Sequence, residues 1–307
     1  MSSGLTVSVV IPVRDGERYL GEVLRALARQ TIAHDVLVLD SGSRDESLSI
    51  ARAAGARVLE IAPEQFGHGR TRNLAVECTS GDVVCFLTQD ATPVERWLDN
   101  LLEALDLDPC VGAAYGPHLP RPDTPPMVAR HLTEFFRAFS PTGEPVIQGP
   151  GATPFLSNVN AAYRRACLEP IGFRDLAYAE DQALAGDLLT AGWLKVYHPD
   201  AAVLHAHDYG PINFMRRYFD DYWGLRDTTG WVEPFTLRGT AGGVRRLVIA
   251  DRDWMRDKGW SASRRTAWTC RALIHHTGCK IFAALGSRAD RLPRRLRRRL
   301  SLAGRSD

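Results

Sequence analysis

The amino-acid sequence predicts an α/β protein, with a mostly parallel sheet covered by helices on both faces and a helical extension after it. Strand-like and helix-like segments alternate four times within residues 6–106, which is typical of strand–helix units. The first strand-like segment, residues 6–13, is a β-branched run of the kind expected for a strand buried on both faces. Charge also changes along the chain: residues 245–307 contain 17 Lys and Arg but 5 Asp and Glu, a net charge of +12, whereas the whole chain carries +2.

The first half contains four strand–helix units. The first helix places Leu20, Leu24 and Leu27 at helical spacing, and the second carries Ser43 and Glu46 at the spacing of a capping box. The expected strands are residues 6–13, 34–40, 56–62 and 81–87, and the expected helices are 17–30, 43–55, 70–80 and 97–106.

The second half is less regular. Residues 108–160 are rich in Pro and Gly, and they include a strand at 111–116, an aromatic helix around 131–139 and a long loop at 140–154. A strand and a helix follow in 155–173. A further helix begins at Glu180, and a strand is expected over 195–207.

Three polar clusters follow expected strands. They are Arg14-Asp15, Asp40-Ser41 and Gln89-Asp90, and in parallel sheets ligands bind beyond the carboxyl ends of the strands. Each cluster alone is also compatible with a helix cap or a turn, but three at equivalent positions indicate one shared site. Neither GxGxxG nor GxxxxGK[ST] occurs at these turns, so a Rossmann dinucleotide site and a P-loop are not supported.

Two later clusters carry groups suited to catalysis. Glu180 and Asp181 open a helix, where carboxylates are favoured by the helix dipole, and a carboxylate fixed there can also act as a general base. His205 and His207 are two residues apart on an expected strand. They are either surface histidines, or one of them binds the same metal ion as Asp90. In the second case phosphate oxygens and water would complete the metal site.

Composition excludes several other classes. The chain is 45% hydrophobic and 24% charged, and no apolar run approaches the ~18–20 residues that span a bilayer. Its first residues lack the basic region of a signal peptide. The six cysteines form no CxxC pair, which argues against zinc and favours a reducing compartment. We therefore expect a cytoplasmic protein, with a location at the cytoplasmic face of the inner membrane as an alternative.

Taken together, residues 7–209 resemble the family 2 inverting glycosyltransferases of GT-A fold. The resemblance rests on VSVVIPVRDGERYL, LVLDSGSRDES, RTRNLA and the AED segment that contains Asp181. FGHGRTRN, FLTQDA and the Arg-rich end of the chain are similar to a rhamnosyltransferase subgroup. The family usually carries Asp-x-Asp where this chain has Thr88-Gln89-Asp90, so one carboxylate is missing. The resemblance implies a GT-A catalytic domain over 1–225 and a basic helical extension over 226–307.

The resemblance also implies roles for single residues. Asp181 would be the catalytic base, and Asp90 with His205 would bind Mg²⁺ or Mn²⁺, with His207 as the alternative ligand. The residues expected to contact the nucleotide-sugar donor are Val13, Asp15, Asp40, Arg72, Asn73, Gln89 and Asp90.

The implied reaction is transfer of L-rhamnose from dTDP-L-rhamnose to a glycan or lipid-linked glycan precursor. A UDP-sugar donor and a catalytically silent sugar-nucleotide-binding scaffold are the alternatives, and the departure at Thr88 motivates the latter. A sugar nucleotidyltransferase would need a longer Gly-rich phosphate loop after the first strand. The basic extension either packs on the catalytic domain or contacts anionic membrane, and nucleic acid is not expected as a partner.

Overall fold

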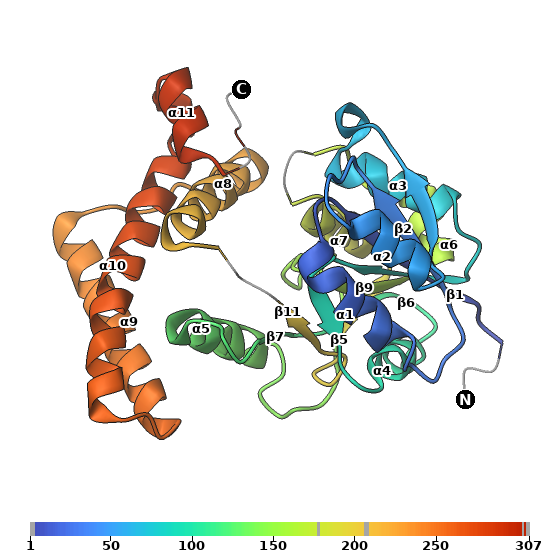
Figure 1. The fold of residues 1–307 in the computed structure, drawn as a ribbon, viewed down its shortest axis with the longest axis horizontal. Coiled ribbons are helices and arrows are strands. Elements are labelled where there is room, and N and C mark those ends of the chain that lie inside the picture. The colour runs from blue at the N-terminus through green and yellow to red at the C-terminus, as the bar shows by residue number, and fades with distance from the viewer. Residues whose placement is uncertain (1–3, 177–178, 206–208, 303, 305–307) are drawn as a thin grey trace. The chain divides into compact units, whose positions relative to one another are not determined.

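A computed structural model describes residues 4–176, 179–205, 209–302 and 304. The chain forms two compact units (Figure 1). Unit 1 comprises Met1–Asp123 and Leu132–Ala206, and unit 2 comprises Thr124–His131 and His207–Asp307. The domains expected at 1–225 and 226–307 stay a prediction, because compactness alone does not show which part folds by itself.

Unit 1 begins with the four predicted strand–helix units. Their strands form one side of the sheet, in the order β3-β2-β1-β4, and all pair in parallel. The elements are β1 (Val7–Val13), α1 (Glu17–Leu27), β2 (Asp35–Asp40), α2 (Ser47–Ala53), β3 (Arg57–Glu60), α3 (His68–Glu77), β4 (Val83–Leu87) and α4 (Trp97–Leu105). This confirms the α/β class.

The sheet continues with strands from the second half of unit 1. Its full order is β3-β2-β1-β4-β9-β6-β10-β8, in which β9 is antiparallel to both neighbours and β8 is an antiparallel edge strand. The added strands are β6 (Val111–Tyr115), β8 (Val146–Gln148), β9 (Asn160–Arg164) and β10 (Leu194–Tyr197), with helices α6 (Arg165–Ile171) and α7 (Glu180–Thr190).

A second, three-stranded sheet lies in unit 1. It has the order β5-β11-β7 and consists of β5 (Ala91–Pro93), β7 (His118–Pro120) and β11 (Val203–His205). The single strand expected over 195–207 was therefore wrong, because β10 belongs to the large sheet and β11 to the small one. The loop expected at 140–154 contains β8.

The apolar spacing of the first helix correctly predicted its buried face. Leu20, Val23 and Leu27 are at most 1% exposed and pack in the main core with β1, β4 and α4. The expected capping box at Ser43 was wrong, since α2 begins only at Ser47. The Ser43 hydroxyl instead accepts a hydrogen bond from the Asp15 amide (2.9 Å).

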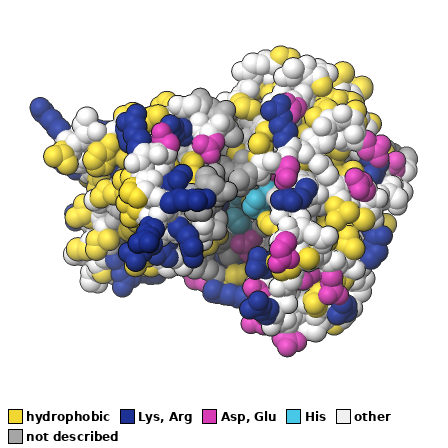
Figure 2. Space-filling model, turned by 90° about the horizontal axis from the view of Figure 1, so that it is seen from above, with side chains coloured by type: hydrophobic (Ala, Val, Ile, Leu, Met, Phe, Trp, Pro, Cys, Tyr) yellow, Lys and Arg dark blue, Asp and Glu magenta, His cyan; other side chains and the backbone are white. Residues whose placement is uncertain are grey.

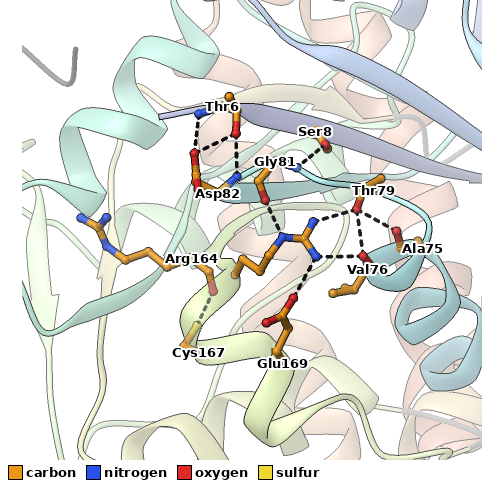
Figure 3. Close-up of polar contacts among 11 residues, drawn as sticks. Thr6, Ser8, Ala75, Val76, Thr79, Gly81, Asp82, Arg164, Cys167 and Glu169 are labelled. Atoms are coloured by element: carbon orange, nitrogen blue, oxygen red, sulfur yellow. Dashed lines mark hydrogen bonds and ion pairs between the residues drawn. The ribbon is translucent and has the colours of Figure 1, made fainter. Parts of the chain in front are cut away.

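Polar contacts connect the elements at the amino end of β4 (Figure 3). The Arg165 guanidinium donates to the Gly81 carbonyl (2.7 Å), the Val76 carbonyl (2.9 Å) and the Thr79 hydroxyl (3.1 Å). It therefore joins α6 to the end of α3 and the start of β4. This cluster lies at the opposite end of the sheet from the carboxyl ends of β1, β2 and β4, which leaves those ends available for a site.

Unit 2 is helical. It contains α8 (Pro211–Thr229), α9 (Leu237–Asp257), α10 (Ala262–Gly286), α11 (Arg294–Leu300) and the first part of α5 (Pro126–Arg137). Asp251 of α9 is fully buried and pairs with Arg130 of α5 and His276 of α10, each at 2.6 Å. Within the described residues, no helix is both long and apolar enough to cross a membrane.

Candidate active site

The strand register brings the expected polar clusters to one edge of the sheet. Val13 at the end of β1 pairs with Asp40 at the end of β2. Gln89 follows the parallel neighbour β4, and its carboxamide pairs with the backbone of Arg14, accepting from the amide at 2.8 Å and donating to the carbonyl at 3.1 Å. Both polar ends of Gln89 are thus used to fix the loop after β1.

That loop has a constrained backbone. Asp15 has φ +50°, in the left-handed region that non-glycine residues rarely adopt. Its carboxylate accepts from the Arg44 amide (2.8 Å), so Asp15 connects the loop after β1 to the loop after β2. The structure therefore gives Asp15 a loop contact, and its expected contact with the donor stays a prediction.

Asp40 has one carboxylate oxygen available. Its Oδ1 accepts from the amides of Gly42 and Ser43, both at 2.9 Å. Its Oδ2 is buried and has no hydrogen-bond partner within the described part of the chain. A buried oxygen without a partner costs free energy, so it favours a ligand that brings an N–H or O–H group. Val13, 2% exposed, lies beside it in the register.

Asp90 and His205 meet although they are far apart in the sequence. Ala91 pairs with His205 in the small sheet, which places the neighbouring Asp90 carboxylate 3.4 Å from the His205 Nε2. Burial would raise the pKa of Asp90, but the hydrogen bond and charge of His205 outweigh it and lower the pKa.

This pair fits part of a divalent-metal site. A carboxylate oxygen and an imidazole nitrogen are both suitable donors, and Asp90 retains 29% side-chain exposure through which further ligands can enter. No group of three His, Cys, Asp or Glu suited to a metal occurs among the described residues, so phosphate oxygens or water would have to complete the coordination. His207, the alternative ligand, lies outside the described residues.

Two residues that the sequence analysis missed support this pair. The Arg121 guanidinium donates to the Asp90 carbonyl (3.3 Å) and the Thr92 hydroxyl (2.7 Å), which fixes the start of β5. The His118 ring of β7 contacts the His205 ring edge-on, with centroids 5.2 Å apart. Neither residue has a sequence signal, because each acts through a strand pairing that only the fold reveals.

The acidic pair at the start of α7 has two different environments. Glu180 is buried, and its carboxylate pairs with Arg72 (3.0 Å) and accepts from the Asn158 side chain (3.3 Å). Arg72 is therefore held by Glu180, while its Nε is buried without a partner in the described structure. The expected role of Arg72 in holding the nucleotide stays a prediction.

Asp181 is the carboxylate suited to proton transfer. It accepts from the backbone amides of Asn158 (3.1 Å) and Gln182 (2.8 Å), so its orientation is fixed. Burial, with the negative charge of Glu180 as the next cause, raises the pKa of Asp181 to about 7. A carboxylate with such a pKa can exchange a proton near neutral pH.

The backbone connects Asp181 to the edge where Asp90 lies. Ala179, just before α7, has φ +58°, so the turn that presents the acidic pair is strained. Asn158, which binds Asp181, precedes β9, and Asn160 of β9 pairs with Leu87 at the end of β4. Because β9 is antiparallel to β4, its beginning lies at the carboxyl end of β4, near Asp90.

Asn73 has a different environment from the one expected of a donor ligand. Its carboxamide donates to the carbonyl of Phe173 and accepts from the amide of the same residue, both at 2.8 Å. It thus connects α3 to the segment that leads to α7. Gly69 allows this close approach, because a Cβ there would lie 2.0 Å from the Arg174 carbonyl oxygen.

A mostly parallel sheet with carboxylates gathered at the carboxyl ends of its strands is the architecture expected of the GT-A fold. Residues 8–172, more than half of the chain, match the family described as Glycosyl transferase family 2. The chain therefore belongs to this family, which confirms the resemblance stated from the sequence.

Two relatives of the chain have a more specific description than the family as a whole. The chain is 34% identical to the O-antigen chain rhamnosyltransferase RfbN of Salmonella typhimurium, over 70% of this chain and 71% of RfbN. It is 32% identical to the O-antigen chain rhamnosyltransferase WbaN of Salmonella anatum, over 69% and 70% of the two chains.

The fold is also found among solved structures. The mannosyltransferase PcManGT of Pyrobaculum calidifontis, solved with GDP-Man and Mn²⁺, has a TM-score of 0.62 and 20% identity, over 95% of this chain and 89% of that one. At this level of identity the likeness supports the fold and not the donor.

Proposed function

We propose that this glycosyltransferase transfers L-rhamnose from dTDP-L-rhamnose to a hydroxyl group of a lipid-linked glycan or polysaccharide precursor, with inversion at the anomeric carbon. The observation that carries the choice of sugar is the similarity to two O-antigen rhamnosyltransferases across about 70% of the chain.

In the proposed mechanism the donor lies at the carboxyl edge of β1, β2 and β4. The free Oδ2 of Asp40 accepts a hydrogen bond from the nucleoside, whose ring packs against Val13. Asp90 and His205 are the residues that would hold Mg²⁺ or Mn²⁺. When bound, the cation would supply positive charge that stabilises the leaving nucleoside diphosphate.

Asp181 is the proposed base. Its carboxylate accepts the proton of the acceptor hydroxyl as the oxygen attacks the anomeric carbon and the bond to the diphosphate breaks. The attack comes from the face opposite the leaving group, so one displacement inverts the configuration. The fixed orientation of Asp181 and its pKa of about 7 support this assignment.

Calorimetric titration of the purified protein tests the donor. With Mn²⁺ present, we expect dTDP-L-rhamnose to bind at least tenfold more tightly than UDP-glucose, UDP-galactose or GDP-mannose. Asp40→Asn replaces the carboxylate that contains the unpartnered Oδ2 by an amide, and it should weaken binding of every donor. Preference for a UDP-sugar would overturn the rhamnose assignment and leave the site intact, whereas binding of no donor would contradict the proposed donor site.

A further inference from the structure

The outer face of α10 in unit 2 is apolar. The sequence places Ala267, Cys270, Ile274, Ile281 and Leu285 on one helical stripe. In the structure the first four are exposed, Ile274 by 65% and Ile281 by 39%, whereas Leu285 packs against the buried cluster around Phe219. The opposite face of the helix is the packed one. Its buried residues are Ala272, His276, Cys279 and Ala283. The exposed stripe therefore does not contribute to the core of unit 2.

Tryptophans and basic groups gather around the turn between α9 and α10, residues 258–261. Each of three indole rings has a cation over its face. The pairs, with the distance to the ring centroid, are Lys258–Trp254 (5.6 Å), Arg264–Trp260 (3.6 Å) and Arg271–Trp268 (4.8 Å). Trp rings and basic side chains are the residues that favour the interface between lipid headgroups and acyl chains.

The charge of this hairpin favours an anionic partner. Residues 237–286 contain ten Lys and Arg and three Asp and Glu, and one of those acids, Asp251, is buried against Arg130 and His276. On the outer side of α9, Arg245 and Arg252 are exposed, while Arg256 pairs with the two other acids, Asp253 (2.8 Å) and Asp257 (3.3 Å). Figure 2 views the molecule from the end at which α11 lies, and there too its left part shows many basic and hydrophobic side chains and few acidic ones.

We propose that the α9–α10 hairpin docks on a bilayer that contains anionic lipid. The docking face consists of the stripe Ala267, Cys270, Ile274 and Ile281 with the exposed Arg271 beside it, and the two tryptophan–cation pairs of the α9–α10 turn lie at its end. Ile274 and Ile281 enter the interfacial layer, and the cations lie among the lipid phosphates. A nucleic acid would leave the apolar stripe in water, and a second copy of the chain would bring the same basic groups together. The proposal goes beyond the transfer reaction and does not depend on the donor.

Vesicle co-sedimentation of the full chain tests the docking face. We expect vesicles of 30% phosphatidylglycerol and 70% phosphatidylcholine to bind the protein at least tenfold more tightly than pure phosphatidylcholine, and added salt to weaken the binding. Ile274→Ser should reduce binding about tenfold. Arg271→Glu should reduce it about fivefold or more.

Matched controls come from unit 1. Leu107 is 48% exposed and Arg29 is exposed in the turn after α1, so Leu107→Ser and Arg29→Glu change the same types of group elsewhere. Both controls should bind vesicles as the wild type does. Equal binding to neutral and anionic vesicles, or equal losses in the control variants, would overturn the proposal.

Fluorescence of the unmodified protein gives a second readout that does not depend on how the variants fold. Brominated lipid should quench the tryptophan emission of the wild type on vesicle binding. No quenching in the wild type would contradict the docking face. Concentration-dependent dimers that Ile274→Ser converts to monomers, without vesicle binding, would assign the stripe to a second copy instead.

Discussion

At the scale of single residues, the pKa of Asp181 sets the pH dependence of transfer. Its pKa of about 7 means that the carboxylate, the form that accepts a proton, dominates only above that pH. We expect kcat/KM to fall about tenfold per pH unit below pH 7 and to level off above it. Asp181→Asn should lower kcat by about 10²–10⁴-fold. A rate that stays constant from pH 5 to 8 would contradict this role.

Glu180 provides a sharper test of the same carboxylate. Its negative charge contributes to the raised pKa of Asp181, after burial. Glu180→Gln removes that charge, so the pH at which activity is half-maximal should move to a lower value. A pH–rate profile of the two proteins measures the shift, and movement to higher pH would contradict the electrostatic account.

Gln89 should act by positioning the loop after β1. Gln89→Glu keeps an acceptor for the Arg14 amide but loses the donor to the Arg14 carbonyl. We expect the Kd of the donor to rise about tenfold, since a carboxylate would then face that carbonyl oxygen. Calorimetry measures the effect, with Gln65→Glu on the exposed surface as the control. An unchanged Kd would mean that the loop holds its position without this contact.

Part of this site could be predicted from the sequence. The polar residues at strand ends and the later acidic pair were visible in the pattern. The structure places Asp90 and His205, the expected metal ligands, 3.4 Å apart, and their metal role stays a prediction. The engagement of Gln89 and Asn73 with backbone groups 75 and 100 residues away was not predictable. Such contacts depend on tertiary placement, which local spacing does not contain.

At the scale of elements, Lys195 holds β10 to the edge strand β8 and to the segment before β9. Its ammonium group is buried, donates to the Gln148 side chain and the Phe155 carbonyl (3.0 Å), and lies over the Tyr115 ring. Burial lowers the pKa of Lys195 to about 8 from an ordinary 10.5. The folded state therefore binds this proton less tightly than the unfolded state does.

The sign of the resulting pH effect follows from that difference. Between pH 8 and 10.5 the unfolded chain binds more protons at this position, so the contribution of Lys195 to the free energy of unfolding should rise by about 3 kcal/mol. Urea denaturation of the wild type and Lys195→Met over this range isolates the contribution as a difference. Parallel pH dependences of the two proteins would contradict a lowered pKa.

The elements of the first half were predictable because their hydrophobic periods are long and regular. The short strands were harder, since β5, β7, β8 and β11 contain three residues each, too few for a period to emerge. Their identity depends on pairing with distant strands. The antiparallel placement of β9 between β4 and β6 likewise has no local signal.

At the scale of the whole molecule, the change of charge along the chain correctly indicated a second, helical and basic part. The point at which the compact units divide was not predictable from the sequence. The local pattern of α8 does not indicate to which unit it belongs, and residues 124–131 join unit 2 from the middle of the chain. The two O-antigen rhamnosyltransferases are similar to this chain over about 70% of its length, mostly outside the basic end.

The rate of nucleoside diphosphate release tests rhamnosyl transfer most directly. It is measured with a lipid-linked glycan acceptor and either dTDP-L-rhamnose or UDP-glucose as the donor. Each donor is tested with Mn²⁺ and with chelator. We expect release from dTDP-L-rhamnose to be at least 10²-fold faster, to require the metal and to be lost in Asp181→Asn. Equal rates with the two donors, or full activity of Asp181→Asn, would contradict rhamnosyl transfer with Asp181 as the base.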